Sequence, residues 1–193
     1  MKPSLLSNPV LKPVFYIIGV IGLFIFGWRT HGKMPNLKKY ILIAAPHTTN
    51  WDFIFFLLII FKFQIPVHWM GKHTMFIRPF RHLLIRLGGI PIDRSQKSNT
   101  VQIMADEFKQ ADRLIVTIAP SGTRSGEYQN VTEWKSGFYR IAHQAGVPIV
   151  CGFVDYQKKM GGIGPVVEPT GDMEEDMARM KAFYADKAGK YDR

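Results

Sequence analysis

A histidine and an aspartate, His47 and Asp52, are the residues of this chain best suited to acid–base chemistry. They follow an apolar run over residues 41–45, which Pro46 closes, and they precede an almost wholly apolar run over residues 53–63. This order predicts a buried strand, then a polar loop, then a buried or membrane-facing helix. The pair would therefore lie in and beside the loop that connects a strand to the following helix.

The spacing of the pair sets a condition on how it could work. Side chains five positions apart on one continuous helix are separated by about 140° around its axis. If His47 lies in the loop and Asn50 caps the helix, the chain can fold back and bring the carboxylate to the imidazole. Asp52 would then hold one ring nitrogen, and the other could accept a proton. The pair alone also fits an ordinary loop histidine beside a charge at a helix start.

The charge balance indicates an anionic partner. The chain has 25 Lys and Arg against 15 Asp and Glu, a net charge of +10. Several basic residues are interleaved with aromatic ones, as over residues 76–81, which suits a membrane interface. The sequence shows no zinc-finger, helix-turn-helix or RNA-binding signature, so we expect no nucleic-acid partner. The apolar share of 47% is too low for a protein with several membrane spans.

Residues 1–28 contain an uncharged run over residues 14–28. That run is shorter than the ~20 residues of a spanning helix, and no small-x-small cleavage site follows it. We expect a membrane-associated helical segment that lies in one leaflet and anchors the protein to the cytoplasmic face of the cell membrane. A helix belonging to the core is the alternative. The single cysteine, Cys151, excludes an intramolecular disulfide and suggests a reducing compartment; its apolar surroundings predict a buried thiol.

Residues 29–193 predict a single α/β domain. Further strands are indicated near residues 67–70, at 89–92, at 114–118 and at 147–150, with helical patterns between them. Strands alternating with helices predict a mixed, mostly parallel sheet flanked by helices, with polar loops gathered beyond the strand ends. No repeat or low-complexity linker divides this region.

Two of those polar loops carry cations. Arg94 follows the short strand at 89–92 and could be an anion hook or simply pair with Asp93. The loop over residues 119–125 has a glycine, which permits close backbone approach. Its threonine, arginine and serine supply donors suited to phosphate oxygens.

Four blocks, in this order and approximate spacing, resemble the lysophospholipid acyltransferase family, which includes 1-acylglycerol-3-phosphate acyltransferase. The resemblance covers roughly residues 28–170, and the H-x4-D block is the weakest of the four taken alone. One departure stands out, because Ser121 occupies the position where the family usually carries glutamate. The blocks are His47–Asp52, Gly89–Arg94, Pro120–Ser125 and Val147–Val150.

The resemblance implies a glycerol-3-phosphate acyltransferase-like α/β fold. It also implies transfer of an acyl group from acyl-CoA or acyl carrier protein to the hydroxyl of a lysophospholipid such as 1-acylglycerol-3-phosphate. His47 would be the general base and Asp52 would fix its tautomer. No cofactor or metal is expected. The expected phosphate-binding cations are Arg94, Arg124 and Lys72, and the expected oxyanion or acceptor loop is Ser121, Gly122 and Thr123.

Two alternatives stay open. The same dyad could act on water, which would make the protein a thioesterase or another hydrolase. The loss of glutamate at Ser121 also allows a lipid-binding relative without activity. Membrane lipids are expected partners in every case. The sequence does not specify the acceptor head group, the acyl-chain length, the choice of CoA or carrier protein, or the oligomeric state.

Overall fold

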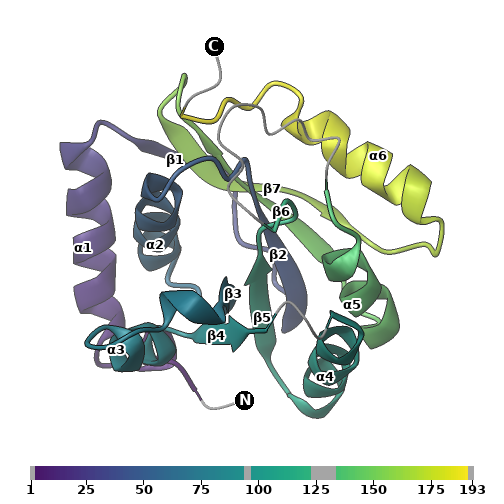
Figure 1. Cartoon of the computed structure of the whole chain (residues 1–193). Helices are drawn as coiled ribbons and strands as arrows, with labels where there is room; N and C mark the ends of the chain where they lie inside the picture. The colour runs from purple at the N-terminus through teal and green to yellow at the C-terminus, as the bar shows by residue number, and fades with distance from the viewer. Residues whose placement is uncertain (1–2, 94–96, 123–133, 191–193) are drawn as a thin grey trace.

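The computed structural model describes residues 3–93, 97–122 and 134–190 of the chain. Within these residues seven strands form one sheet in the order β1-β7-β6-β2-β5-β3-β4 (Figure 1). The elements are η1 (Leu5–Ser7), α1 (Lys12–Ile25), β1 (Arg29–His31), β2 (Lys39–Ala45), α2 (Trp51–Phe63), β3 (Val67–Lys72), η2 (His73–Met75), α3 (Arg81–Arg86), β4 (Gly89–Ile92), α4 (Lys97–Gln110), β5 (Leu114–Ile118), α5 (Gly137–Ala145), β6 (Ile149–Asp155), β7 (Met160–Val167) and α6 (Met173–Tyr184).

The centre of the sheet is parallel. Strands β6, β2, β5, β3 and β4 run in one direction, whereas β7 pairs antiparallel with β6 and β1 runs parallel to β7. The predicted mixed, mostly parallel α/β sheet is therefore confirmed. The sequence did not reveal β1, because Arg29-Thr30-His31 is short and polar and shows no alternation.

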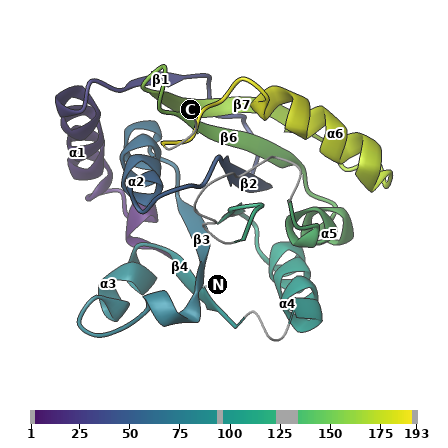
Figure 2. The same ribbon diagram turned by 45° about the horizontal axis from the view of Figure 1, so that its top comes forward.

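Helices cover both faces of the sheet (Figure 2). Helices α1 and α2 lie on one side, and α4, α5 and α6 lie on the other. Along β2, Ile41 and Ile43 belong to the core beside α5 and α6, while Tyr40 and Leu42 belong to the core beside α2. A strand buried on both faces reads as a continuous apolar run, which is why residues 41–45 carry no polar side chain.

The connections place a crevice beside β2. The chain leaves β2 through α2 on one face of the sheet, and it leaves the neighbouring β5 through α5 on the opposite face. Ligand sites in open α/β sheets lie at such a switch point, outside the carboxyl ends of the strands. Strands β2, β5, β3 and β4 all end at this edge of the sheet.

Helix α1 has two different faces. One face packs tightly on α2: Leu23 is buried, and a Cβ added at Gly19 would lie 2.7 Å from the Leu58 carbonyl oxygen. The other face exposes apolar side chains. None of the described helices is long and apolar enough to cross a membrane. The exposed residues are Val14, Tyr16, Ile17, Ile18, Ile21, Phe24 and Ile25.

Candidate active site

Hydrogen bonds around Thr49 hold the loop between β2 and α2. Thr49 Oγ1 accepts a hydrogen bond from the Trp51 N–H (3.4 Å), and Asp52 Oδ2 accepts one from the Thr49 N–H (2.7 Å). The expectation that Asn50 caps the helix is wrong. Its side chain makes no cap hydrogen bond, and its backbone is already helical at φ −65° and ψ −25°. The Thr49 hydroxyl accepts the Trp51 N–H at the start of the helix instead.

The Asp52 carboxylate also contacts the His47 imidazole. His47 Nδ1 lies 3.2 Å from Asp52 Oδ2, and the Thr48 N–H donates to that oxygen at 2.6 Å. The carboxylate is 5% exposed and the imidazole is 23% exposed, so the pair runs from the core to an accessible ring. Because Nδ1 faces Asp52, Nε2 is the nitrogen on the far side of the ring. The structure therefore brings the two residues together in the arrangement that a general base requires.

His47 and Asp52 line a cavity of about 550 Å³ between α2 and the sheet. Phe53, Phe56, Ile59 and Ile60 of α2 form one wall, and Ala44 and Gly152 lie among the sheet residues opposite. Their small size leaves space beneath the helix. A Cβ at Gly152 would come within 3.0 Å of the Leu42 side chain, itself part of the lining. The volume falls within the roughly 300–1,000 Å³ of small-ligand sites.

Of the other predicted site residues, Lys72 and Gly122 line the same cavity. Arg94, Thr123 and Arg124 lie outside the described residues. Gly122 adopts φ +69°, in the left-handed region that favours glycine, and its N–H donates to the Ala119 carbonyl oxygen at 3.0 Å. That N–H, a candidate oxyanion donor, is thus engaged within its own turn.

Ser121 presents a buried hydroxyl oxygen. Its Oγ has no hydrogen-bond partner among the residues that the structure describes. Among those residues, too, no three His, Cys, Asp or Glu side chains form a group that could hold a metal ion. Cys151 lies fully buried in β6, where burial raises the pKa of its thiol to about 12, so it stays protonated near neutral pH.

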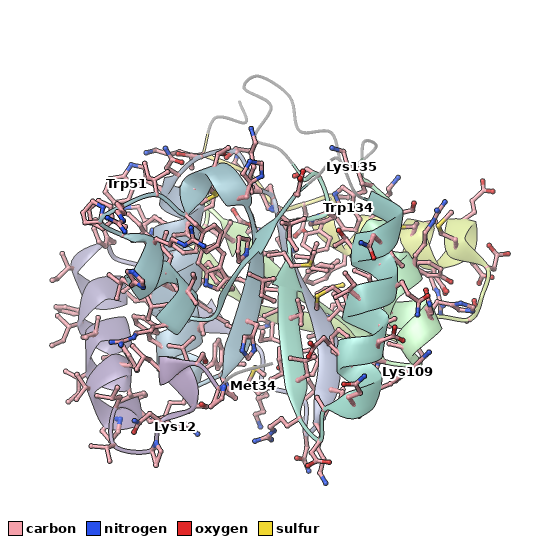
Figure 3. All side chains as sticks on the ribbon, turned by 60° about the horizontal axis from the view of Figure 1, so that its bottom comes forward. Lys12, Met34, Trp51, Lys109, Trp134 and Lys135 are labelled. Atoms are coloured by element: carbon pink, nitrogen blue, oxygen red, sulfur yellow. The ribbon has the colours of Figure 1, made fainter. Side chains whose placement is uncertain are left out.

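Two lysines near the site, Lys135 and Lys190, do not belong to any of the sequence motifs. The Lys135 side chain lies against Gly122: a Cβ added at Gly122 would be 3.2 Å from Lys135 Cδ. The Lys190 ammonium lies 5.1 Å from the centre of the Trp51 ring, and the Lys190 N–H donates to Thr48 Oγ1 at 3.1 Å. Figure 3 shows Trp51 and Lys135 toward the same end of the molecule, with Lys12 at the opposite end. Neither lysine stands in a recognisable pattern, so only the fold reveals them.

Comparison with known proteins adds to this geometry. The model of the family described as Acyltransferase matches residues 28–153. The chain belongs to this acyltransferase family. The matched region contains both members of the His47–Asp52 pair and most of the residues that line the cavity.

One relative agrees with this membership, and one solved structure has the same fold. The chain is 28% identical over 145 residues to a 1-acyl-sn-glycerol-3-phosphate acyltransferase of Streptococcus pneumoniae, which covers 70% of this chain and 51% of the relative. It thus spans about half the length of that curated acyltransferase. The crystal structure of the 1-acyl-sn-glycerophosphate (LPA) acyltransferase PlsC from Thermotoga maritima superposes with a TM-score of 0.59 at 18% identity, over 93% of this chain and 82% of that one. The predicted acyltransferase-type fold is therefore confirmed.

Proposed function

We propose that this protein transfers a fatty acyl group from a thioester, acyl-CoA or acyl carrier protein, to the free hydroxyl of a lysophospholipid such as 1-acylglycerol-3-phosphate. The observation that carries the proposal is the His47–Asp52 pair on the wall of a largely apolar cavity. The names of the two relatives support the same acceptor class.

The chemistry follows from the pair. A hydroxyl is a weak nucleophile at neutral pH, and Nε2 of His47 would take its proton as the oxygen attacks the thioester carbonyl. Asp52 would hold Nδ1 and stabilise the imidazolium. Collapse of the tetrahedral intermediate breaks the carbon–sulfur bond, and the imidazolium returns the proton to the departing thiolate. The apolar cavity would hold the acyl chain, and no protein nucleophile is needed.

Cations at the same end of the sheet would bind the phosphate of the acceptor. Lys72 lines the cavity and Lys135 lies over the Gly122 turn. The motif arginines Arg94 and Arg124 are proposed as further ligands, because guanidinium groups form paired hydrogen bonds with phosphate oxygens.

The exposed face of α1 would bind the protein to the cytoplasmic face of the membrane. Apolar side chains are also exposed beside arginines over residues 77–86, at Ile77, Phe80 and Leu83. Apolar residues flanked by basic ones suit insertion among anionic headgroups.

The decisive experiment offers acyl-CoA and acyl carrier protein to the purified protein with a panel of lysophospholipids, and follows both thiol release and acylated product by mass spectrometry. Transfer predicts one thiol for each acylated lipid and little thiol without acceptor. Thiol release that is independent of lysolipid would show a thioesterase. Vesicle binding without turnover would show a lipid-binding protein.

A further inference from the structure

The two oxygens of the Asp52 carboxylate have different partners. Oδ2 accepts from the Thr48 and Thr49 N–H groups and faces His47 Nδ1, whereas Oδ1 accepts a 2.6 Å hydrogen bond from the Tyr156 hydroxyl. Tyr156 comes just after β6, 104 residues along the chain from Asp52, and lies beyond the region matched by the family model. We propose that Tyr156 is a positioning residue that locks the Asp52 carboxylate so that Oδ2 stays directed at His47.

The Tyr156 ring is held from several sides. Its edge-on neighbours are Trp28, with ring centres 5.0 Å apart at 88°, and Phe55, at 5.7 Å and 87°. Trp28 and Phe55 themselves stack at 3.9 Å. The Tyr156 N–H donates to the Ala188 carbonyl oxygen at 2.9 Å. Phe55 is about one helical turn after Asp52, so one of the residues that orient the ring belongs to the same helix as the carboxylate that Tyr156 contacts.

A carboxylate can rotate about its terminal torsion, which has broad energy wells. Among the described residues, backbone donors hold only Oδ2, so the hydrogen bond to Oδ1 is needed to fix the plane of the group. Loss of the Tyr156 hydroxyl would leave Oδ1 buried without this donor, which favours rotation toward another partner. The imidazole would then lose the fixed acceptor that keeps its proton on Nδ1. Tyr156 does not line the cavity, so substrate binding should be unaffected.

This inference rests on the proposed function, and its first test is kinetic. Tyr156→Phe keeps the ring and should lower kcat about tenfold, with KM for donor and acceptor within about twofold. In an Asp52→Asn background, Tyr156→Phe should not lower kcat any further, because Tyr156 acts on catalysis only through the Asp52 carboxylate. An undiminished kcat, or a full additional loss in the Asp52→Asn background, would overturn the proposal.

Tyr139→Phe is the matched control. The Tyr139 hydroxyl also donates to a buried aspartate, Asp176, at 2.7 Å, but that pair lies outside the site. This substitution should lower the thermal midpoint and leave kcat unchanged. Phe55→Leu gives a second variant should Tyr156→Phe not fold. It removes the Phe55 contact with the Tyr156 ring, together with the stack on Trp28, and keeps the Tyr156 hydroxyl. It should lower kcat, and only when Asp52 is present.

A spectroscopic measurement separates this proposal from the proposed function. In protein labelled with ¹⁵N-histidine, the His47 signals, assigned by their loss in His47→Gln, should show the proton on Nδ1. Tyr156→Phe should shift them toward a mixture of the two tautomers, and Tyr139→Phe should not. Unchanged His47 signals in Tyr156→Phe would refute the positioning role, whatever the enzyme's activity. A wild type that is silent with every donor and acceptor would refute the proposed function alone.

Discussion

At the scale of single residues, Asp52 has both a structural and a proposed chemical role. Its Oδ2 accepts the Thr49 N–H just before α2 and also faces the imidazole. Spacing alone made the pair possible, but the chain folds back because two backbone N–H groups and a tyrosine hydroxyl all converge on this carboxylate. The aspartate is therefore the member of the pair that these hydrogen bonds fix in position.

Asp52→Asn should lower turnover by about 10²–10⁴-fold, by analogy with carboxylates that hold a catalytic tautomer. The thermal midpoint should fall modestly as well, since an amide nitrogen cannot accept the hydrogen bonds that the carboxylate accepts. Initial rates of acyl transfer, measured together with thermal unfolding, test both parts. A fully active Asp52→Asn protein would show that the carboxylate serves only as a helix cap.

Ser121 is the residue that departs from the motif of the family, which usually carries glutamate at this position. A serine cannot neutralise neighbouring cations as a glutamate does, but its hydroxyl can donate to an anion. That hydroxyl is buried and has no partner within the described part of the chain. We therefore expect the wild type to be active and to favour anionic acceptors.

Ser121→Glu should shift acceptor preference and raise KM most for the most anionic lysophospholipid, because a carboxylate would repel its phosphate. Ser121→Ala is the matched control for loss of the hydroxyl without added charge. Both variants would be measured on one acceptor panel. A silent wild type together with an active Ser121→Glu would contradict this expectation.

At the scale of elements, α1 serves both the core and, by our proposal, the membrane. Residues 1–28 are poorly suited to a simple deletion test, because Trp28 is buried against Phe55 and α1 packs tightly on α2. Deletion should therefore destabilise the domain as well as weaken membrane binding. Substitutions on the exposed face separate the two effects.

Ile21→Ser and Phe24→Ser together should weaken binding to anionic vesicles by about tenfold or more, since each removes an exposed apolar side chain that could insert. Thermal stability should change little. Ile103→Ser, an equally exposed position on α4 across the sheet, is the control and should leave binding unchanged. Vesicle co-sedimentation would compare the wild type, the double variant and the control. Binding by the double variant equal to that of the wild type would show that α1 does not contact the membrane.

At the scale of the whole molecule, the buried Asp176 carboxylate links several elements through hydrogen bonds and should make stability depend on pH in the acid range. Burial works to raise its pKa, but hydrogen bonds from the Thr170 N–H, the Tyr139 hydroxyl and the Arg179 guanidinium outweigh burial and lower the pKa to about 2. A lowered pKa in the folded state adds stability that is present above the usual value of 3.8 and is lost as the pH falls toward 2.

Asp176→Asn should therefore lower the free energy of unfolding at pH 7 by on the order of 1–2 kcal/mol. It should also flatten the fall in stability between about pH 4 and pH 2. Urea denaturation at a series of pH values provides the measurement. The same pH dependence in both proteins would show that Asp176 does not contribute to the loss of stability in acid.

Much of the architecture could be predicted because it depends on local pattern. The apolar runs of β2 and β5 and the polar loops after them follow directly from burial on both faces of a parallel sheet. The rest depends on contacts between distant segments. Tyr156, Lys135 and Lys190 reach the site only through strand order and side-chain packing, and no spacing in the sequence connects them with His47.

The central claim is that His47 is the base of an acyl transfer, and one comparison of rates tests it most directly. Wild type and His47→Ala would be given the same acyl thioester and 1-acylglycerol-3-phosphate, and the diacylated product would be quantified by mass spectrometry. We expect the variant to fall to the uncatalysed background while its thermal midpoint and vesicle binding stay as in the wild type, since His47 lies on an accessible loop. Turnover by His47→Ala within about tenfold of the wild type would contradict the claim.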